Sequence, residues 1–407
     1  MSHRYFFQPR MIAGLILLGA SSQSFAAPSL NTFMQRVWQE NPAIQASESA
    51  LEAARSRKIA ADKPIYNPEI GADLEKATAD TFSIGINQTV DWGNKRNAST
   101  GIADAEIQLA QAELSSQRLS ISAEILNALT NLQAIRAMQN LAQQRVDLMQ
   151  ELLKNTEKRQ QAGDVGLQDA ALARVALSEA KIQFANAAAT QAKYVTQLQV
   201  ATALFVKQWP SLQQAPPSLA ALSNVEKYLQ QLPAIRALKA ELIAAKSNVN
   251  LSKAQRKADP SFGVRGGTED GQALVGVSFS IPLMLRNSYR AEVEVANQEA
   301  LQIEHMMRYA ILRAEAHLKG SHQRYQLTYD AWQSWQANGL NSLKEQMDLI
   351  KTIWKSGEMS TSDYLIQAKQ NVDAQQTAVR LSAQMWEAWI EWLVASGQIE
   401  QWIKQSK

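Results

Sequence analysis

The chain has 407 residues, a formal net charge of +3 and no cysteine. The absence of cysteine excludes disulfides, thiolate metal sites, cysteine nucleophiles and an N-terminal lipid on cysteine. Basic and acidic residues are interspersed along the sequence, whereas a nucleic-acid-binding protein normally concentrates its basic residues on one face. We therefore expect no nucleic acid partner.

The N-terminal segment 1–26 has the pattern of a secretory signal peptide. Arg4 and Arg10 precede a short apolar run, Met11–Ala20, and Ser24-Phe25-Ala26 is a small-residue cleavage pattern. The apolar run is too short to span a bilayer and is typical of a cleaved signal. We predict that the mature chain begins just after this segment and works outside the cytoplasm.

Matching residue groups recur in the same order in the two halves of the chain. Asn67-Pro68 returns as Asp259-Pro260, and the segment around Gly85 returns around Gly276. Other matches pair Asn41-Pro42-Ala43-Ile44 with Leu232-Pro233-Ala234-Ile235, and Gly163 and Asp169 with Gly357 and Asp363. Several ordered matches indicate a duplicated unit. The predicted organisation is a first repeat at 27–207, a proline-containing connector at 208–231 and a second repeat at 232–407.

Each repeat is predicted to contain a very long helix. Between Ile102 and Ala162 there is no glycine or proline, and apolar residues recur at heptad spacing. Such a helix is roughly 90 Å long at 1.5 Å per residue. The heptad period favours side-by-side packing against other helices, as in coiled coils. A similar stretch at 287–356 is interrupted by Gly320 and Gly339.

Two β-hairpins are predicted, at about 69–92 and about 261–283. Along Phe82–Trp92 and Ala273–Leu283, apolar and polar side chains alternate, so each strand has one apolar and one polar face. A half-buried sheet in a soluble protein would show the same alternation. Strands of about 10 residues also match the length that crosses a bilayer at a tilt.

Four strands are too few to close a barrel, and an open sheet edge in lipid leaves backbone groups unpaired. The two hairpins occupy equivalent places, and each is flanked by helices too long for a compact domain. The sequence therefore predicts an oligomer whose copies share one barrel, with apolar side chains toward lipid and polar ones toward water.

Together these features resemble the TolC-like outer membrane efflux proteins over essentially the whole mature chain. Asn67-Pro68 with Glu75, followed by Gln88 and Trp92-Gly93-Asn94-Lys95-Arg96, is most similar to the cobalt-zinc-cadmium (CzcC-type) branch. The resemblance implies a mixed α+β, mainly α, fold, in which a long α-helical barrel, or tunnel, joins a trimeric 12-stranded transmembrane β-barrel with four strands per protomer. The connector and the C-terminal segment would lie in the equatorial region of the tunnel.

The resemblance also implies a function and a location. The chain would form a homotrimer in the cell outer membrane and extend into the periplasm. It would work with a periplasmic adaptor, or membrane fusion protein, and an inner-membrane RND pump. Its role would be that of a passive export duct for heavy-metal cations, either cobalt, zinc and cadmium or copper and silver.

The family places two interhelical turns at the periplasmic tip, and the two Gly-x5-Asp segments fall there. In a purely structural interpretation, Gly163 and Gly357 end helices, and Asp169 and Asp363 interact with the dipole of the next helix. In the functional interpretation, threefold symmetry places Asp363 and Asp169 in rings at the channel aperture, where they attract cations. The residues then expected to contact the adaptor are Gly163, Val165, Gly166, Leu167, Gly357, Ser360 and Thr361.

Metal-ligand residues occur in the second repeat, at His305, Met306, Met307, His317 and His322. At 100° per residue, His305 and His317 differ by about 120° around a helix, so the histidines do not share a face. We predict no resident metal and no cofactor.

Enzymatic motifs are also missing: the sequence contains no Gly-rich phosphate loop, His-Glu-x-x-His pattern or Gly-x-Ser-x-Gly turn, so we expect no enzyme. The tryptophans Trp386, Trp389, Trp392 and Trp402 are interpreted as packing residues. Two alternatives remain: a TolC-like duct for drug efflux or type I protein secretion, and a soluble periplasmic coiled-coil scaffold.

Overall fold

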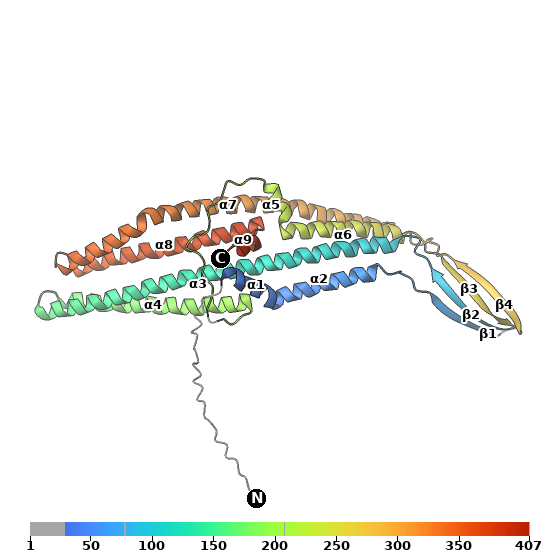
Figure 1. Ribbon diagram of the computed structural model, residues 1–407, viewed down its shortest axis with the longest axis horizontal. Coiled ribbons are helices and arrows are strands. Elements are labelled where there is room, and N and C mark those ends of the chain that lie inside the picture. The colour runs from blue at the N-terminus through green and yellow to red at the C-terminus, as the bar shows by residue number, and fades with distance from the viewer. Residues whose placement is uncertain (1–28, 77–78, 207, 407) are drawn as a thin grey trace, which may run out of the picture.

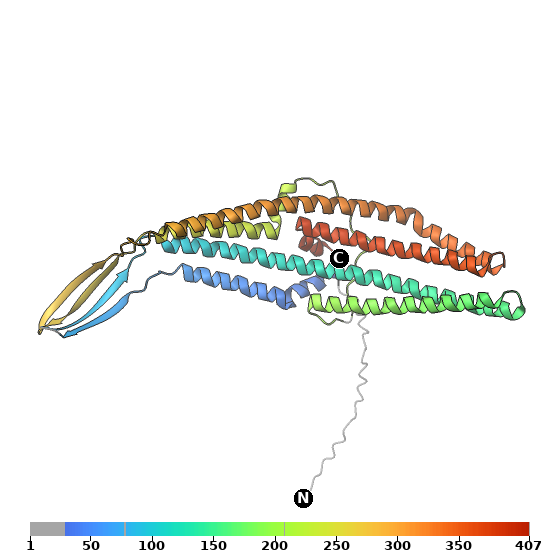
Figure 2. The same cartoon turned by 180° about the vertical axis from the view of Figure 1, so that it is seen from behind.

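The computed structural model describes residues 29–76, 79–206 and 208–406. The predicted signal peptide at 1–26 lies outside the described residues. The chain is an elongated rod with a β-sheet at one end and two helical hairpins at the other (Figure 1). The opposite view shows the long helices running side by side along the rod (Figure 2).

The two halves of the chain follow the same order of elements. The first half comprises α1 (Leu30–Glu40), α2 (Pro42–Ala61), β1 (Glu69–Lys76), β2 (Asp80–Thr89), α3 (Lys95–Ala162) and α4 (Leu167–Thr202). The second half comprises α5 (Val225–Gln231), α6 (Pro233–Gln255), β3 (Ser261–Glu269), β4 (Gln272–Ser280), α7 (Arg290–Lys355), α8 (Thr361–Ser396) and α9 (Ile399–Gln405). The division into repeats at 27–207 and 232–407 stays a prediction.

The long helix α3 has 68 residues and is therefore about 100 Å long at 1.5 Å per residue. The predicted heptad face is buried: Ile121, Ile125, Leu132 and Met149 are each at most 6% exposed. The helix begins at Lys95 rather than near Ile102, because another side chain supplies its N-terminal cap.

That cap is Asp91, which sequence alternation assigned to a strand. Its two carboxylate oxygens accept hydrogen bonds from the backbone N–H groups of Lys95 and Arg96, each at 2.9 Å. These donors have no partner within the helix, so the carboxylate stabilises the helix start. Strand β2 consequently ends at Thr89, three residues short of the predicted Trp92. In the other hairpin, β4 ends at Ser280, two residues before Pro282, which has no N–H to donate to a ladder.

The sheet is antiparallel with the order β1-β2-β3-β4. The two hairpins meet where β2 pairs with β3, and Gly85 lies opposite Arg265 in that ladder. The outer strands β1 and β4 therefore each keep one edge without a strand partner among the described residues. The predicted mainly helical class with four strands per chain is confirmed.

One face of the sheet is apolar and open to solvent in the single chain. Ile70, Leu74, Val275 and Val277 are between 78% and 86% exposed. Side chains alternate between faces along a strand, so the polar residues between them lie on the opposite face. Apolar surface of this extent is not left against water in a stable assembly.

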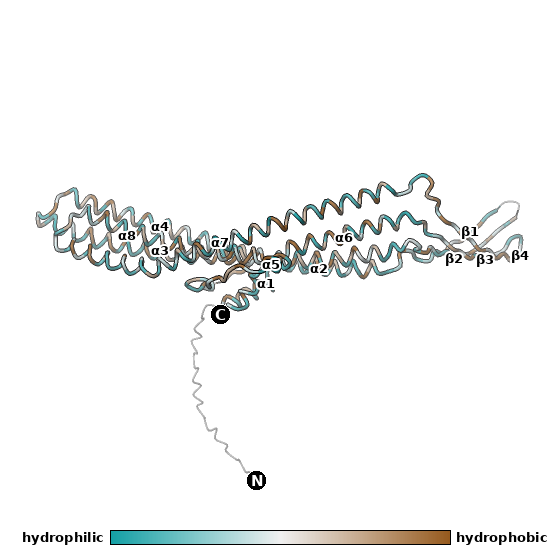
Figure 3. The backbone as a smooth tube through the Cα atoms, turned by 90° about the horizontal axis from the view of Figure 1, so that it is seen from above, coloured by the Kyte–Doolittle hydropathy of each residue, from teal (hydrophilic) through white to brown (hydrophobic). Residues whose placement is uncertain are grey.

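The main hydrophobic core lies midway along the rod, where α1, α9 and the end of α8 pack around the middle of α3. Trp389 stacks on Trp392 at 5.1 Å and meets Trp402 edge-on at 6.1 Å. Trp386, Trp389 and Trp392 are buried, which agrees with the predicted packing role. Viewed from above, α1 and α5 lie near this midpoint, α2 and α6 run from it toward the sheet, and α4 and α8 run toward the opposite end (Figure 3).

Among the residues described, no helix combines the length and the apolar character that crossing a membrane requires.

Candidate functional site

The predicted site residues lie in two turns at the end of the rod farthest from the sheet (Figure 1). The first turn joins α3 to α4, and the second joins α7 to α8. The same local chemistry ends one helix and starts the next in both turns.

In the first turn, Gly163 ends α3 in the left-handed conformation, with φ of 83°. The backbone N–H of Asp164 donates to the carbonyl of Arg159 at 2.9 Å, which satisfies a carbonyl at the helix end. Helix α4 then starts after Gly166, whose N–H donates to a carboxylate oxygen of Asp169 at 3.2 Å. Asp169 therefore has a defined structural role as a cap.

In the second turn, Gly357 has φ of 85°, and the N–H of Glu358 donates to the carbonyl of Ile353 at 3.2 Å. Ser360 caps α8 by accepting from the N–H of Asp363 at 3.1 Å. The Ser360 hydroxyl in turn donates to the Asp363 carboxylate at 2.6 Å. The structural interpretation of both aspartates thus accounts for one oxygen of each carboxylate.

The remaining charge of these aspartates has no cationic partner within the described part of the chain. Asp363 is exposed and Asp169 is half-buried, and neither takes part in an ion pair there. Both carboxylates can therefore act on ions in the surrounding water. In a single chain they lie in separate turns, and only an assembly would arrange them in rings.

Exposure differs among the residues predicted to contact the adaptor. Leu167 is 75% exposed, and Gly163, Gly166, Gly357 and Ser360 are also exposed. Val165 is half-buried. Thr361 is only 4% exposed, so its side chain packs inside the chain.

A contact between the two helical hairpins was not visible in the sequence. Glu151 of α3 forms ion pairs with Lys351 at 2.8 Å and Lys355 at 3.0 Å, both from α7. The hydrogen bonds from Lys351 and then Lys355 lower the pKa of Glu151 below its usual value. The residues that form these ion pairs are far apart in sequence, so no local sequence pattern predicts the contact.

Beneath these ion pairs, an apolar cluster joins the same hairpins. Trp354 stacks on Tyr364 with ring centroids 5.0 Å apart, and both side chains are buried. Burial raises the pKa of Tyr364 to about 12, so the phenol stays neutral at physiological pH.

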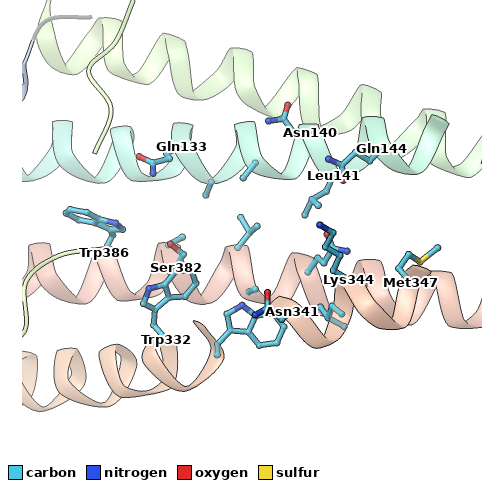
Figure 4. A pocket seen from close by; sticks show the side chains of 18 of the residues that line it. Gln133, Asn140, Leu141, Gln144, Trp332, Asn341, Lys344, Met347, Ser382 and Trp386 are labelled. Atoms are coloured by element: carbon cyan, nitrogen blue, oxygen red, sulfur yellow. The ribbon is translucent and has the colours of Figure 1, made fainter. Parts of the chain in front are cut away.

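Between the tip cluster and the core at the middle of the rod, the hairpins separate around a cavity of about 760 Å³ (Figure 4). Gln133 and Leu141 of α3 lie on one side, and Trp332, Ser382 and Trp386 lie on the other. The hairpins therefore contact each other in two separate zones.

Another cluster of polar side chains lies where the sheet joins the helices. The Asp259 carboxylate accepts from the Lys95 ammonium at 2.6 Å and from the Tyr66 hydroxyl at 2.6 Å, and Asp259 is 5% exposed. Burial is the largest influence and would raise the pKa of Asp259, but the bonds from Lys95 and Tyr66 lower it overall. The bond to Asp259, followed by burial, raises the pKa of Tyr66 to about 12.

The candidate metal-ligand residues of α7 do not converge. His322 bonds to the backbone carbonyl of Ala220 at 3.0 Å. Within 29–76, 79–206 and 208–406, no group of three or more histidine, aspartate or glutamate side chains could hold a metal ion.

Comparison with known proteins agrees with this geometry. Residues 33–204 match the model of the family described as outer membrane efflux protein. The chain belongs to the TolC-like outer membrane efflux family. It is therefore an outer membrane efflux channel component that extends into the periplasm, and the family is one of non-enzymatic transport proteins. This membership sets aside the alternative of a soluble scaffold.

Two relatives and one solved structure show which members of the efflux family the chain is similar to. The chain is 25% identical to the cobalt-zinc-cadmium resistance protein CzcC of Cupriavidus metallidurans, over 73% of this chain and 70% of that protein. It is 24% identical to the pyoverdine export outer membrane protein OpmQ of Pseudomonas aeruginosa, over 88% of this chain and 83% of that protein. The crystal structure of CusC superposes with a TM-score of 0.77 at 15% identity, over 91% of this chain and 92% of CusC.

Proposed function

We propose that three copies of this chain close a twelve-stranded barrel in the outer membrane and export heavy-metal cations passively. A periplasmic adaptor meets the tip turns, and an inner-membrane RND pump supplies the energy. TolC-like channels are generally trimers that act with an adaptor and an inner pump, which supports this assembly.

The proposal rests on the outer edges of the sheet at the end of the rod. Within residues 29–76, 79–206 and 208–406, its two outer strands each have one edge without a strand partner, and one of its faces carries the exposed apolar residues described above. Backbone groups at a sheet edge must be paired in lipid, so further strands are required. Copies of the same chain supply them by pairing β4 of one protomer with β1 of the next.

The charges on the polar face of the sheet favour cations as cargo. That face carries Glu69, Asp73 and Glu75 on β1 and Glu269 on β3, against one arginine, Arg265. In a closed barrel this face lines the water-filled interior, where acidic side chains raise the local cation concentration. The similarity to the cobalt-zinc-cadmium resistance protein points to the same cargo class.

At the other end, Asp363 and Asp169 form the acidic rings of the aperture in this proposal. The exposed turn residues Gly163, Gly166, Leu167, Gly357 and Ser360, with the half-buried Val165, form the surface for the adaptor. Because Thr361 is buried, it supports this surface from beneath rather than contacting the adaptor.

A second cargo has an observation in its favour. The pyoverdine export protein OpmQ matches a larger share of this chain than the metal resistance protein does. The same duct could then export drugs, siderophore-like molecules or, in the type I pathway, proteins.

The aperture is tested by Asp363→Asn in planar lipid bilayers. Asparagine keeps an oxygen that accepts from Ser360 and removes the charge, so the helix cap survives. Three unit charges about 10 Å from a pore axis contribute on the order of 1 kcal/mol in water, so cation preference should fall about fivefold at low salt.

The matched control is Asp164→Asn, which removes an exposed carboxylate from the first turn outside the proposed rings. Its preference for cations should stay close to that of the unmodified channel. Equal selectivity of the Asp363→Asn and unmodified channels would reject the ring.

The cargo is tested by deleting the gene and growing the strain with graded zinc, cobalt, cadmium and copper salts. Heavy-metal export predicts a lower tolerated concentration of at least one metal, restored by the intact gene. Unchanged metal tolerance combined with drug or siderophore sensitivity would favour the second cargo.

A further inference from the structure

On the polar face of the sheet, one arrangement occurs twice. A side chain of one strand crosses above a glycine of the neighbouring strand, toward the strand on the far side of that glycine. Asn87 of β2, Gly263 of β3 and Ser278 of β4 lie in one row across the ladder. The Ser278 hydroxyl donates to the Asn87 side-chain oxygen at 3.4 Å, above the glycine. A Cβ at Gly263 would lie 1.9 Å from that oxygen, so only glycine leaves room for this bridge.

Arg265 adopts the same arrangement, but its side chain points away from β2. In its row, Gly85 of β2 and Gly276 of β4 flank it. A Cβ placed on Gly276 would lie 2.8 Å from the arginine Nε, so the side chain runs across Gly276 toward the free edge of β4. Among the described residues, no carboxylate pairs with Arg265.

The strand that lies beyond this edge in the proposed trimer is β1 of the next copy. Its polar face presents Glu69, Asp73 and Glu75, all exposed in the single chain. In the proposed trimer, the Arg265 guanidinium, which points over the edge of β4, thus faces the row of carboxylates on β1 of the next copy.

The internal repeat identifies the residue that stands opposite. Gly85 corresponds to Gly276, and Arg265 follows Pro260 by the same interval as Asp73 follows Pro68. Applied to the observed pair of Gly85 and Arg265, this correspondence places Gly276 opposite Asp73 of the neighbouring copy.

We propose that Arg265 reaches over Gly276 to form an ion pair with Asp73 of the next protomer. This ion pair fixes the register of the seam, the boundary at which β4 of one copy pairs with β1 of the next. The partner is a second copy of this chain, and the inference rests on the proposed trimer. Strands two apart in a sheet are separated by about 9.6 Å, the distance that Ser278 and Asn87 already bridge over Gly263. Three such pairs occur in the closed barrel, one at each seam.

The seam is read out directly by cysteine crosslinking, since the chain contains no cysteine of its own. Asp73→Cys and Gly276→Cys are combined in one chain, which is oxidised in outer membranes and run on a non-reducing denaturing gel. The proposed register predicts crosslinked dimers and trimers that a reductant dissolves, and neither single variant should crosslink.

Register controls combine Gly276→Cys with Gly71→Cys or with Glu75→Cys, which tests shifts of two residues in either direction. Stronger crosslinking with position 71 or 75 than with position 73, or a trimer without any crosslink, would overturn the register. A chain that remains a monomer in the membrane would overturn the trimer itself, so the two failures are distinguishable.

The ion pair is tested separately by charge exchange. Arg265→Glu and Asp73→Arg should each lower the temperature at which the trimer dissociates in detergent, because each places like charges across the seam. The double variant restores opposite charges and should recover most of that loss. Additive effects of the two changes would show that the residues do not interact.

Discussion

At the scale of single residues, the ion pair of Asp259 and Lys95 determines how the sheet is joined to the helices. Their contact joins the start of α3 to a residue two positions before β3, so one carboxylate fixes how the sheet leaves the helices. The asparagine that precedes the matching proline, Asn67, carries no charge. The two junctions are therefore built differently despite the sequence match.

Replacing Asp259 by asparagine should lower the free energy of unfolding by about 3 kcal/mol, since the Lys95 ammonium, whose side chain is only 16% exposed, would lose its carboxylate partner. The lowered pKa of Asp259 means that this stability is fully present above the ordinary aspartate pKa of 3.8 and is lost as pH falls through the folded-state pKa. Thermal unfolding in detergent between pH 7 and pH 3 measures both effects.

Asp104→Asn provides the matched control, because Asp104 pairs with Lys58 on the surface and its side chain is 46% exposed. Exposed pairs contribute about 0.2–1 kcal/mol, so this change should have a small effect. Similar losses from the two substitutions would contradict the importance assigned to the buried pair.

At the scale of helices and strands, the tip turns and the long helices follow from local rules. The glycines of the tip turns were predicted from sequence, since a helix end in the left-handed conformation favours glycine. The start of α3 was not, because Asp91 continues the strand alternation and also caps the helix. A period-two pattern contains no information about where hydrogen bonding passes from strand to helix.

Alanine substitution separates the two kinds of glycine in this chain. Gly163→Ala and Gly357→Ala should each cost about 1 kcal/mol, because alanine is strained at φ near 85°. Gly320→Ala should instead stabilise the chain by about 0.5–1 kcal/mol, since Gly320 is inside α7 and a Cβ there meets nothing within 4 Å. Chemical denaturation in detergent measures the three values, and a common sign would contradict the assignment.

The contact between hairpins gives a second prediction at this scale. Glu151→Gln should remove both ion pairs to α7 while keeping a similar shape, and the tip should open more readily to protease or to hydrogen exchange. The Glu151 pKa is lowered, so the unmodified contact is intact at neutral pH and weakens as pH falls through the folded-state value. Identical exchange in the tip of both proteins at pH 7 would show that the apolar cluster alone holds the hairpins together.

At the scale of the whole molecule, the sequence was sufficient for the class and family, because hairpins and heptad helices are local patterns that recur in a fixed order. It was not sufficient for the contacts that join the halves. Glu151 with Lys351, and Asp259 with Lys95, pair across long stretches of sequence and appear only when the fold brings them together. The burial of Thr361 is likewise a property of packing.

In the part of the chain that the structure describes, apolar sheet surface and two strand edges are exposed, and the proposed trimer would cover both. Mass measurement of the intact protein, extracted from outer membranes in mild detergent and kept native, tests this most directly. We expect a particle of three chains that loses solubility when the detergent is removed. A monomer that stays in solution without detergent would contradict it.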